Sequence, residues 1–127
     1  MNTKIAKVAK AAEQSPVFVR DGLSAMDLRA VRELKTHLQE TVPLHRLIVF
    51  GSRARGDADP ESDLDVLVEL NHADLRARKL VTEGAWEVSL RNSMVIMPVT
   101  VDRSEWETGV QKSSLLARAI AMEGVEV

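Results

Sequence analysis

A strand, a glycine turn and a second strand between residues 47 and 70 constrain the fold of this chain more than any other feature. The apolar run 47–50 has the composition of a strand that is covered on both faces. Gly51 and Ser52 follow it directly, and the run 64–70 then alternates apolar and polar positions, as in a half-buried strand. The pattern predicts a sheet in which the first turn allows a ligand to approach the backbone closely.

The turn has the composition of an anion site. Gly51 permits close approach of the backbone, and the Ser52 hydroxyl can cap a helix or bind an anion. If the residues after Ser52 open a helical turn, its N–H groups attract negative charge, and two arginines add positive charge. We therefore predict a triphosphate site formed by Gly51, Ser52, Arg53 and Arg55. The alternative for the two arginines is an ordinary solvated role.

Two aspartates supply candidate metal ligands. Asp63 and Asp65 are two positions apart at the start of the second strand, so both carboxylates should project from the same face. Neighbouring carboxylates repel each other, and a divalent ion relieves that repulsion. Oxygen ligands favour Mg²⁺ or Mn²⁺, held together with the phosphates of ATP or another nucleoside triphosphate. A solvated loop is the alternative for this pair.

The complete pattern resembles the signature of the DNA polymerase β-like nucleotidyltransferase superfamily: Gly51-Ser52, ten intervening residues, then Asp63-Leu64-Asp65. Within it, the chain is most similar to the minimal nucleotidyltransferases, over a core from about residue 23 to about residue 101. The resemblance implies an α+β fold with a small mixed sheet flanked by helices. It also implies that the Gly-Ser pair holds nucleotide phosphates and that the two aspartates hold the metal.

The same resemblance implies a third carboxylate on the strand after the intervening helix. The strand expected at 94–101 contains no acid, and its polar side chain is Thr100. Asp102 is the candidate third catalytic acid if this strand runs one residue further. The alternative for Asp102 is an acid that flanks the helix before Ser104, and Glu87 is a weaker substitute for the missing ligand.

Helical spacing predicts two long helices around the motif. Residues 24–41 carry apolar side chains at helical intervals, with Ser24 as the N-cap. A second helix is expected from Asn71, as its cap, to about residue 90.

The C-terminal third combines one more strand with short helices. Pro98 lacks a backbone donor, so the strand 94–101 should lie at a sheet edge or carry a bulge. Ser104 begins a capping-box pattern, and a helix is expected over 114–122 that stops at Gly124.

Two remaining groups of residues have weaker patterns. Residues 1–22 are expected to form a loosely ordered N-terminal arm, with 23–127 as a single nucleotidyltransferase domain. The histidines His37, His45 and His72 lack metal-ligand spacing, so surface roles are expected.

Composition excludes several classes of function. With 127 residues, a net charge of −2, two Trp, two Phe and no Tyr, the chain lacks the basic field and stacking rings of a tight nucleic-acid binder. Trp86 and Trp106 are expected in helix packing.

The absence of cysteine excludes disulfides and thiolate metal sites. No signal peptide or membrane span is evident, so the cytoplasm is the expected location, and a homo-oligomer is left open.

Three functions fit these observations. The first is transfer of a nucleoside monophosphate, AMP from Mg²⁺-ATP, to a hydroxyl of a protein, an RNA or a small molecule. The resemblance implies a version of it in which the chain is the antitoxin of a small helical HEPN-type toxin; because the chain has no tyrosine, a tyrosine acceptor would be in trans. The second is a catalytically impaired module that binds a nucleotide or a partner. The third, an enzyme of the aminoglycoside nucleotidyltransferase kind, fits less well because such enzymes add a substrate-binding domain.

Overall fold

The computed structural model describes residues 22–57, 59, 61–108 and 114–127, so most of the expected N-terminal arm (1–22) lies outside the described residues and stays a prediction. The helices are α1 (Ala25–Thr41), α2 (Ser52–Arg55), α3 (Leu75–Asn92), α4 (Arg103–Thr108) and α5 (Leu115–Glu123). The strands are β2 (Leu44–Phe50), β3 (Leu64–Leu70), β4 (Ile96–Asp102) and β5 (Val125–Glu126). No described helix combines the length and the apolar character that a membrane crossing requires.

The strands form one mixed sheet in the order β4-β3-β2-β5. The pairs β2–β3 and β2–β5 are antiparallel, and β3–β4 is parallel. This confirms the predicted α+β class with a small mixed sheet flanked by helices. β4, which contains Pro98, lies at the edge of the sheet as predicted. β3 is central and differs from the half-buried strand expected from its alternation, because Leu67 and Glu69 on its second face are buried as well.

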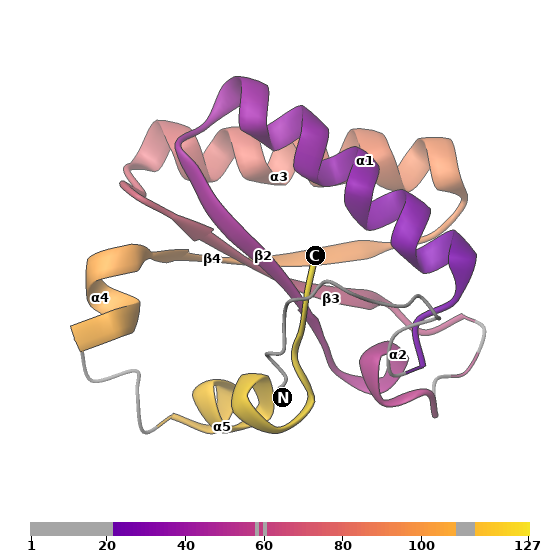
Figure 1. Cartoon of the computed structure of the whole chain (residues 1–127). Coiled ribbons are helices and arrows are strands. Elements are labelled where there is room, and N and C mark those ends of the chain that lie inside the picture. Colours follow the sequence, from indigo (N-terminus) through magenta and orange to yellow (C-terminus); the bar gives the residue numbers. More distant parts are fainter. Residues whose placement is uncertain (1–21, 58, 60, 109–113) are drawn as a thin grey trace.

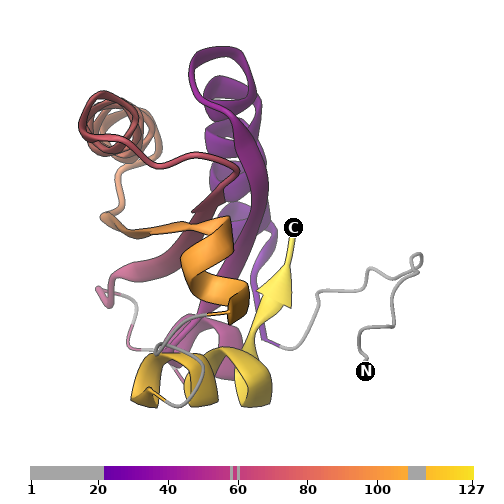
Figure 2. The ribbon, with the colours of Figure 1, turned by 90° about the vertical axis from the view of Figure 1, so that its left-hand side faces the viewer.

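Helices α1 and α3 cover one face of the sheet, and α4 and α5 lie against the other (Figure 1). The first interface is the larger core, with buried side chains that include Val31, Leu34, Leu38, Val66, Val68, Val81 and Val88. The second is a smaller cluster around Ile48, Leu67, Val101 and Trp106. Figure 2 shows α4 and α5 on the side of the sheet opposite to the two long helices. Residues 65, 67 and 69 point to the same face of β3, because residues two apart on a strand share a face. Leu67 packs in the second cluster, so Asp65 and Glu69 lie on the face toward α4 and α5.

The predicted cap of α1 is confirmed, and that of α3 is corrected. Ser24 caps α1 in a capping box with Asp27, as predicted, and the Ser114 hydroxyl, at the start of the helix expected over 114–122, caps α5. The cap of α3 is Asp74 and not Asn71, because the Asp74 carboxylate accepts the Ala77 N–H at 2.8 Å.

Two further expectations about the second half are corrected. α4 begins at Arg103, with Asp102 accepting the N–H of Ser104, so Ser104 is not the cap that the sequence predicted. Trp106 is buried with 9% exposure, as expected, but Trp86 is 66% exposed because it lies on the outer side of α3.

Candidate functional site

The turn after β2 is a single helical turn bounded by two glycines. Gly51 has φ 83° and precedes α2, and Gly56 has φ 84° and ends it. Both angles lie in the left-handed region that favours glycine. The N–H groups of Arg55 and Gly56 donate to the carbonyls of Gly51 and Ser52 at 3.1 and 3.0 Å. The helical turn on which the predicted anion site depends is therefore present, and it begins at Ser52.

This turn packs directly against the second aspartate. Phe50, at the end of β2, is paired with Asp65 on β3. A Cβ built on Gly51 would overlap Oδ2 of Asp65, so the approach requires glycine at this position. Asp63 lies one residue before β3 and two before Asp65, so strand alternation directs both carboxylates to the same side. The structure therefore brings the predicted turn and the predicted metal ligands together.

The protein leaves the Asp65 carboxylate short of positive partners. Burial raises the pKa of Asp65, and the negative charges of Asp63 and Glu123 raise it further, while Arg55 lowers it. Among the described residues, no donor forms a hydrogen bond with this carboxylate. Oxygen ligands with excess negative charge are suited to a divalent cation such as Mg²⁺. The donor set at this site therefore fits the ion that the sequence predicted.

Arg53 is part of the turn, but its side chain points to other partners. Its guanidinium donates to Asp27 Oδ1 at 2.9 Å and to the Ser62 carbonyl at 2.8 Å. Asp27 is buried and belongs to the capping box of α1. These contacts fasten the turn to the start of α1 and to the loop before the aspartates. The phosphate-binding role predicted for Arg53 stays a prediction.

The C-terminal helix adds a residue that the sequence analysis missed. Glu123, the last residue of α5, accepts the Gly51 N–H at 2.6 Å and an Arg55 N–H at 3.1 Å. These bonds are charge-assisted, and the hydrogen bonds from Arg55 to Glu123 and then to Asp57 raise the pKa of Arg55. A carboxylate thus occupies the place on the Gly51 backbone where the sequence predicts a phosphate oxygen.

A weak local signal for Glu123 exists in the sequence. The residue lies 72 positions after Gly51, so no motif connects them. An acid in the last turn of a helix faces the negative end of the helix dipole, which is unfavourable unless another group compensates for it. Here the Gly51 N–H and the Arg55 guanidinium compensate for its charge, and both reach Glu123 because α5 returns to the end of β2.

Asp102 does not join this site. It ends β4, where its register partner on β3 is Leu70, whereas Asp65 is paired with Met97 five residues earlier on β4. Its carboxylate accepts the N–H of Ala73 at 3.0 Å and both the N–H and the hydroxyl of Ser104. These bonds, led by the one from Ala73, lower its pKa to about 2. The structure places Asp102 at the start of α4 as a capping residue.

Met97 occupies the position where a third carboxylate would stand. In parallel strands, residues that are paired in register share a face, so Met97 lies beside Asp65 on the face toward α5. Its side chain is 45% exposed. The acid missing from the sequence of this strand is therefore also missing from the corresponding place in the structure.

Comparison with known proteins agrees with the motif. Residues 31–118 match the model of the nucleotidyltransferase domain family. Over 69 residues the chain is 36% identical to "Putative protein adenylyltransferase MJ0141" of Methanocaldococcus jannaschii, covering 54% of this chain and 68% of that protein.

Solved structures of similar fold are toxin–antitoxin proteins. A crystal structure of a doubly substituted toxin–antitoxin MntA–HpeT superposes with a TM-score of 0.54 at 17% identity, covering 78% of this chain and 69% of that one. A crystal structure of a toxin–antitoxin with AMP-PNP gives a TM-score of 0.52 at 21% identity, covering 75% and 69% of the two chains. At these identities the likeness concerns the fold.

Proposed function

The chain belongs to the nucleotidyltransferase domain family, and we propose that it is a minimal nucleotidyltransferase that transfers AMP from Mg²⁺-ATP to a hydroxyl acceptor. The observation that carries the proposal is the direct packing of Gly51 on the Asp65 carboxylate. This packing joins a turn suited to phosphate with ligands suited to a metal ion. The proposed metal ligands are Asp63 and Asp65, and the proposed phosphate ligands are Gly51, Ser52 and Arg55.

A divalent cation fits this arrangement because Asp65 is partly desolvated and lies beside other negative charges, which raise its pKa. Such an ion, when bound, supplies positive charge for the triphosphate and lowers the pKa of the acceptor hydroxyl. The chain's own residues position the reactants. Gly51 lets phosphates approach the backbone closely, and the carboxylates of Asp63 and Asp65 would hold the metal ion beside this turn.

The proposed acceptor is a hydroxyl group of a partner protein. The relative from M. jannaschii is named as a protein adenylyltransferase, and the structural neighbours are toxin–antitoxin pairs. Because this chain contains no tyrosine, a tyrosine acceptor would come from the partner. We therefore propose a small helical HEPN-type toxin as the partner, with this chain as the antitoxin.

A second candidate function is binding without efficient transfer. Two observations favour it: Met97 stands beside Asp65 in place of an acid, and Glu123 already occupies the Gly51 N–H. A site with two carboxylates can hold a metal-nucleotide, but it anchors an acceptor-activating metal poorly. In this alternative, the chain neutralises its partner by contact and binds the nucleotide without turnover.

One labelling experiment separates these functions. The purified chain, with its co-purified or co-expressed partner, is incubated with Mg²⁺ and ATP labelled at the α-phosphate. We expect label on the partner, and a loss of about a thousandfold or more in the Asp63→Asn, Asp65→Asn double variant. A charge-matched control, Glu40→Gln with Glu83→Gln, changes two exposed acids on α1 and α3 and should leave the labelling intact.

The outcomes of this experiment are distinct. Labelling that persists in the double variant would contradict the assignment of the two aspartates. No label in the wild type, with ATP binding and partner binding both retained, would favour the binding module.

A further inference from the structure

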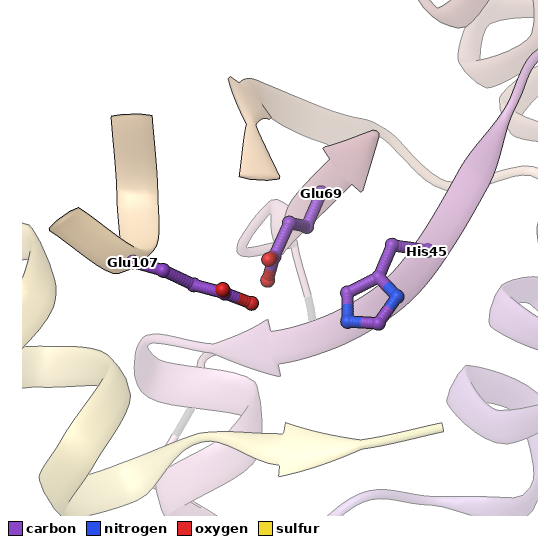
Figure 3. A group of neighbouring side chains, drawn as sticks. All are labelled: His45, Glu69 and Glu107. Carbon is purple, nitrogen blue, oxygen red and sulfur yellow. The ribbon is translucent and has the colours of Figure 1, made fainter. Parts of the chain in front are cut away.

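A second group of metal-ligand side chains lies on the same face of the sheet as Asp65, near the other end of β3. His45 on β2, Glu69 on β3 and Glu107 on α4 each offer a ligand atom, and these three atoms all lie within 4.8 Å of one another. Figure 3 shows the two carboxylates and the imidazole converging from three different elements. Glu69 is four residues after Asp65, about 13 Å along the strand, so the two groups are separate.

The central residue of this group is a buried acid that is only partly compensated. Glu69 has no exposed surface, and its Oε1 accepts a hydrogen bond from Arg46 Nε at 2.6 Å. Its Oε2 is also buried and, in the part of the chain that the structure describes, has no hydrogen-bond partner. Burying a carboxylate oxygen without a partner costs free energy of folding, so a further positive partner at this atom would stabilise the folded chain. The carboxylate of Glu69 points toward the other two side chains (Figure 3).

We propose that His45, Glu69 and Glu107 form a three-ligand site for a divalent transition metal of the Zn²⁺ type. One imidazole nitrogen and two carboxylate oxygens are ligands that Zn²⁺ accepts, with water in the fourth position. Zn²⁺ bonds of about 2.0–2.1 Å in a tetrahedron require ligand atoms about 3.3 Å apart. The three ligand atoms lie within 4.8 Å of one another, which is wider than a Zn²⁺ site requires. Because His45 and Glu107 are exposed, rotation of their side chains can bring the ligand atoms to that distance.

The residues around the group support this geometry. Arg46 holds one oxygen of Glu69, and Arg103 Nε holds Oε2 of Glu107 at 3.0 Å. Each carboxylate therefore keeps its other oxygen for a metal while an outer partner fixes its orientation, which is the usual arrangement around protein metal ligands. The imidazole selects against Mg²⁺, which prefers oxygen ligands.

The site would connect parts of the molecule that are otherwise joined mainly by side-chain packing. A cavity of about 440 Å³ borders it, lined by Arg46, Trp106, Glu107 and three residues of α5 (Ala117, Ile120, Ala121). A bound metal would tie α4 to β2 and β3 beside this cavity and neutralise the buried Glu69 oxygen. Metal binding should therefore stabilise the folded chain.

The test uses the whole chain, freed of metal with a chelator and titrated with Zn²⁺ alone by calorimetry. We expect one site outside the Asp63 and Asp65 pair, with an affinity that falls tenfold or more, roughly, in His45→Gln and in Glu107→Gln. Zn²⁺ should raise the melting temperature of the wild type and have little effect on that of either variant. Co²⁺ in the same site should give the intense visible absorption of a four-coordinate centre, which His45→Gln abolishes.

Matched controls keep the outcome decisive. His72→Gln and Glu105→Gln change an exposed histidine and an exposed acid of α4 outside the group and should leave Zn²⁺ binding unchanged. Both informative variants alter exposed side chains, so they are expected to fold even if a change at Glu69 does not. Unchanged Zn²⁺ affinity in both variants, binding that disappears in the Asp63→Asn, Asp65→Asn variant, or no binding at about 100 µM Zn²⁺ would each overturn the proposal.

Discussion

The two ends of β3 carry acids on the same face of the sheet, but the protein treats them differently. At the first end, the Asp65 carboxylate has two negative neighbours, Asp63 and Glu123, and its pKa is raised. At the other end, the buried Glu69 is paired with Arg46 at 2.6 Å, and His45 lies within ligand distance. One end is a set of oxygen ligands with excess negative charge, and the other is an acid that one arginine partly compensates, beside a nitrogen ligand.

This difference separates two uses of a buried acid. An arginine beside a carboxylate compensates for most of its charge, so Glu69 can stay buried without a bound cation, although its Oε2 has no hydrogen-bond partner among the described residues. Carboxylates without such a partner oppose folding until a cation binds, which is typical of functional sites. Both acids can therefore bind a cation, but the charge of the neighbouring groups lets the fold tolerate an empty site at Glu69 better than at Asp65.

The largest effect is expected from a side chain at Gly51, in the turn that packs on Asp65. Gly51→Ala places a methyl group on the Asp65 carboxylate and forces an L-residue to φ 83°. We expect ATP affinity to fall about a hundredfold and the free energy of unfolding to fall by about 2 kcal/mol. Nucleotide titration and urea unfolding measure the two effects.

A matched change at the other end of that turn is the control. Gly56→Ala also places an L-residue at a positive φ (84°), although its ψ of 9° lies in the αL region, where the strain is smaller than at Gly51 (ψ −163°), and it lies away from the contact with Asp65. If it reduces ATP affinity as much as Gly51→Ala does, backbone strain and not the contact with Asp65 is responsible.

The next effect is expected from removing the cation at the second end. Arg46→Met keeps an apolar stem but leaves Glu69 buried without its partner. We expect a loss of about 2–3 kcal/mol in the free energy of unfolding, measured in urea, with ATP binding unchanged. Arg55→Met removes the exposed arginine at the first end and should leave the unfolding midpoint unchanged. Equal destabilisation by the two variants would break the contrast between the two ends.

A smaller effect is expected from Glu123. Because its carboxylate occupies the Gly51 N–H, a phosphate at this position has to displace it. Glu123→Ala should tighten Mg²⁺-ATP binding by about tenfold, as measured by calorimetry. The exposed Glu126→Ala, three residues later, is the control. Weaker binding and lost transfer in Glu123→Ala would instead identify Glu123 as a metal ligand in place of the missing acid.

The smallest effect concerns pH. The pKa of Asp65 is raised in the folded protein, so the folded state binds more protons than the unfolded state above the ordinary value of 3.8. Stability should therefore fall as pH rises from 3.8 through the raised pKa, and Asp65→Asn should remove this fall and slightly raise the melting temperature at pH 7. Melting temperatures across this range measure it.

Asp102 provides a comparison of opposite sign. Its pKa is lowered to about 2, so its contribution to stability is present above 3.8 and is lost as pH falls from 3.8 through about 2. Asp102→Asn should remove the loss of stability between pH 3.8 and about 2, and it should leave the fall in stability at higher pH, which comes from Asp65, unchanged. The same pH response in both variants would contradict the assigned signs.

Local patterns predicted much of the fold and the centre of the site. The strand at 64–70, the cap at Ser24 and the edge position of Pro98 are local properties, and the structure confirms all three, although the strand is buried on both faces and not on one. The cap of α3 was wrong because Asn71 and Asp74 are both good capping residues, and the path of the chain after β3 selects between them.

The turn and the two aspartates near it follow from local sequence, because glycine, helix capping and strand alternation act over a few residues. Three features depended on the tertiary structure: Glu123 on the Gly51 N–H, Met97 beside Asp65, and His45 with Glu69 and Glu107. Each joins residues that are far apart in the chain, so each depends on strand register and on the docking of α4 and α5. Contacts of this kind are fixed when the sheet and its helices pack together, and no local pattern encodes them.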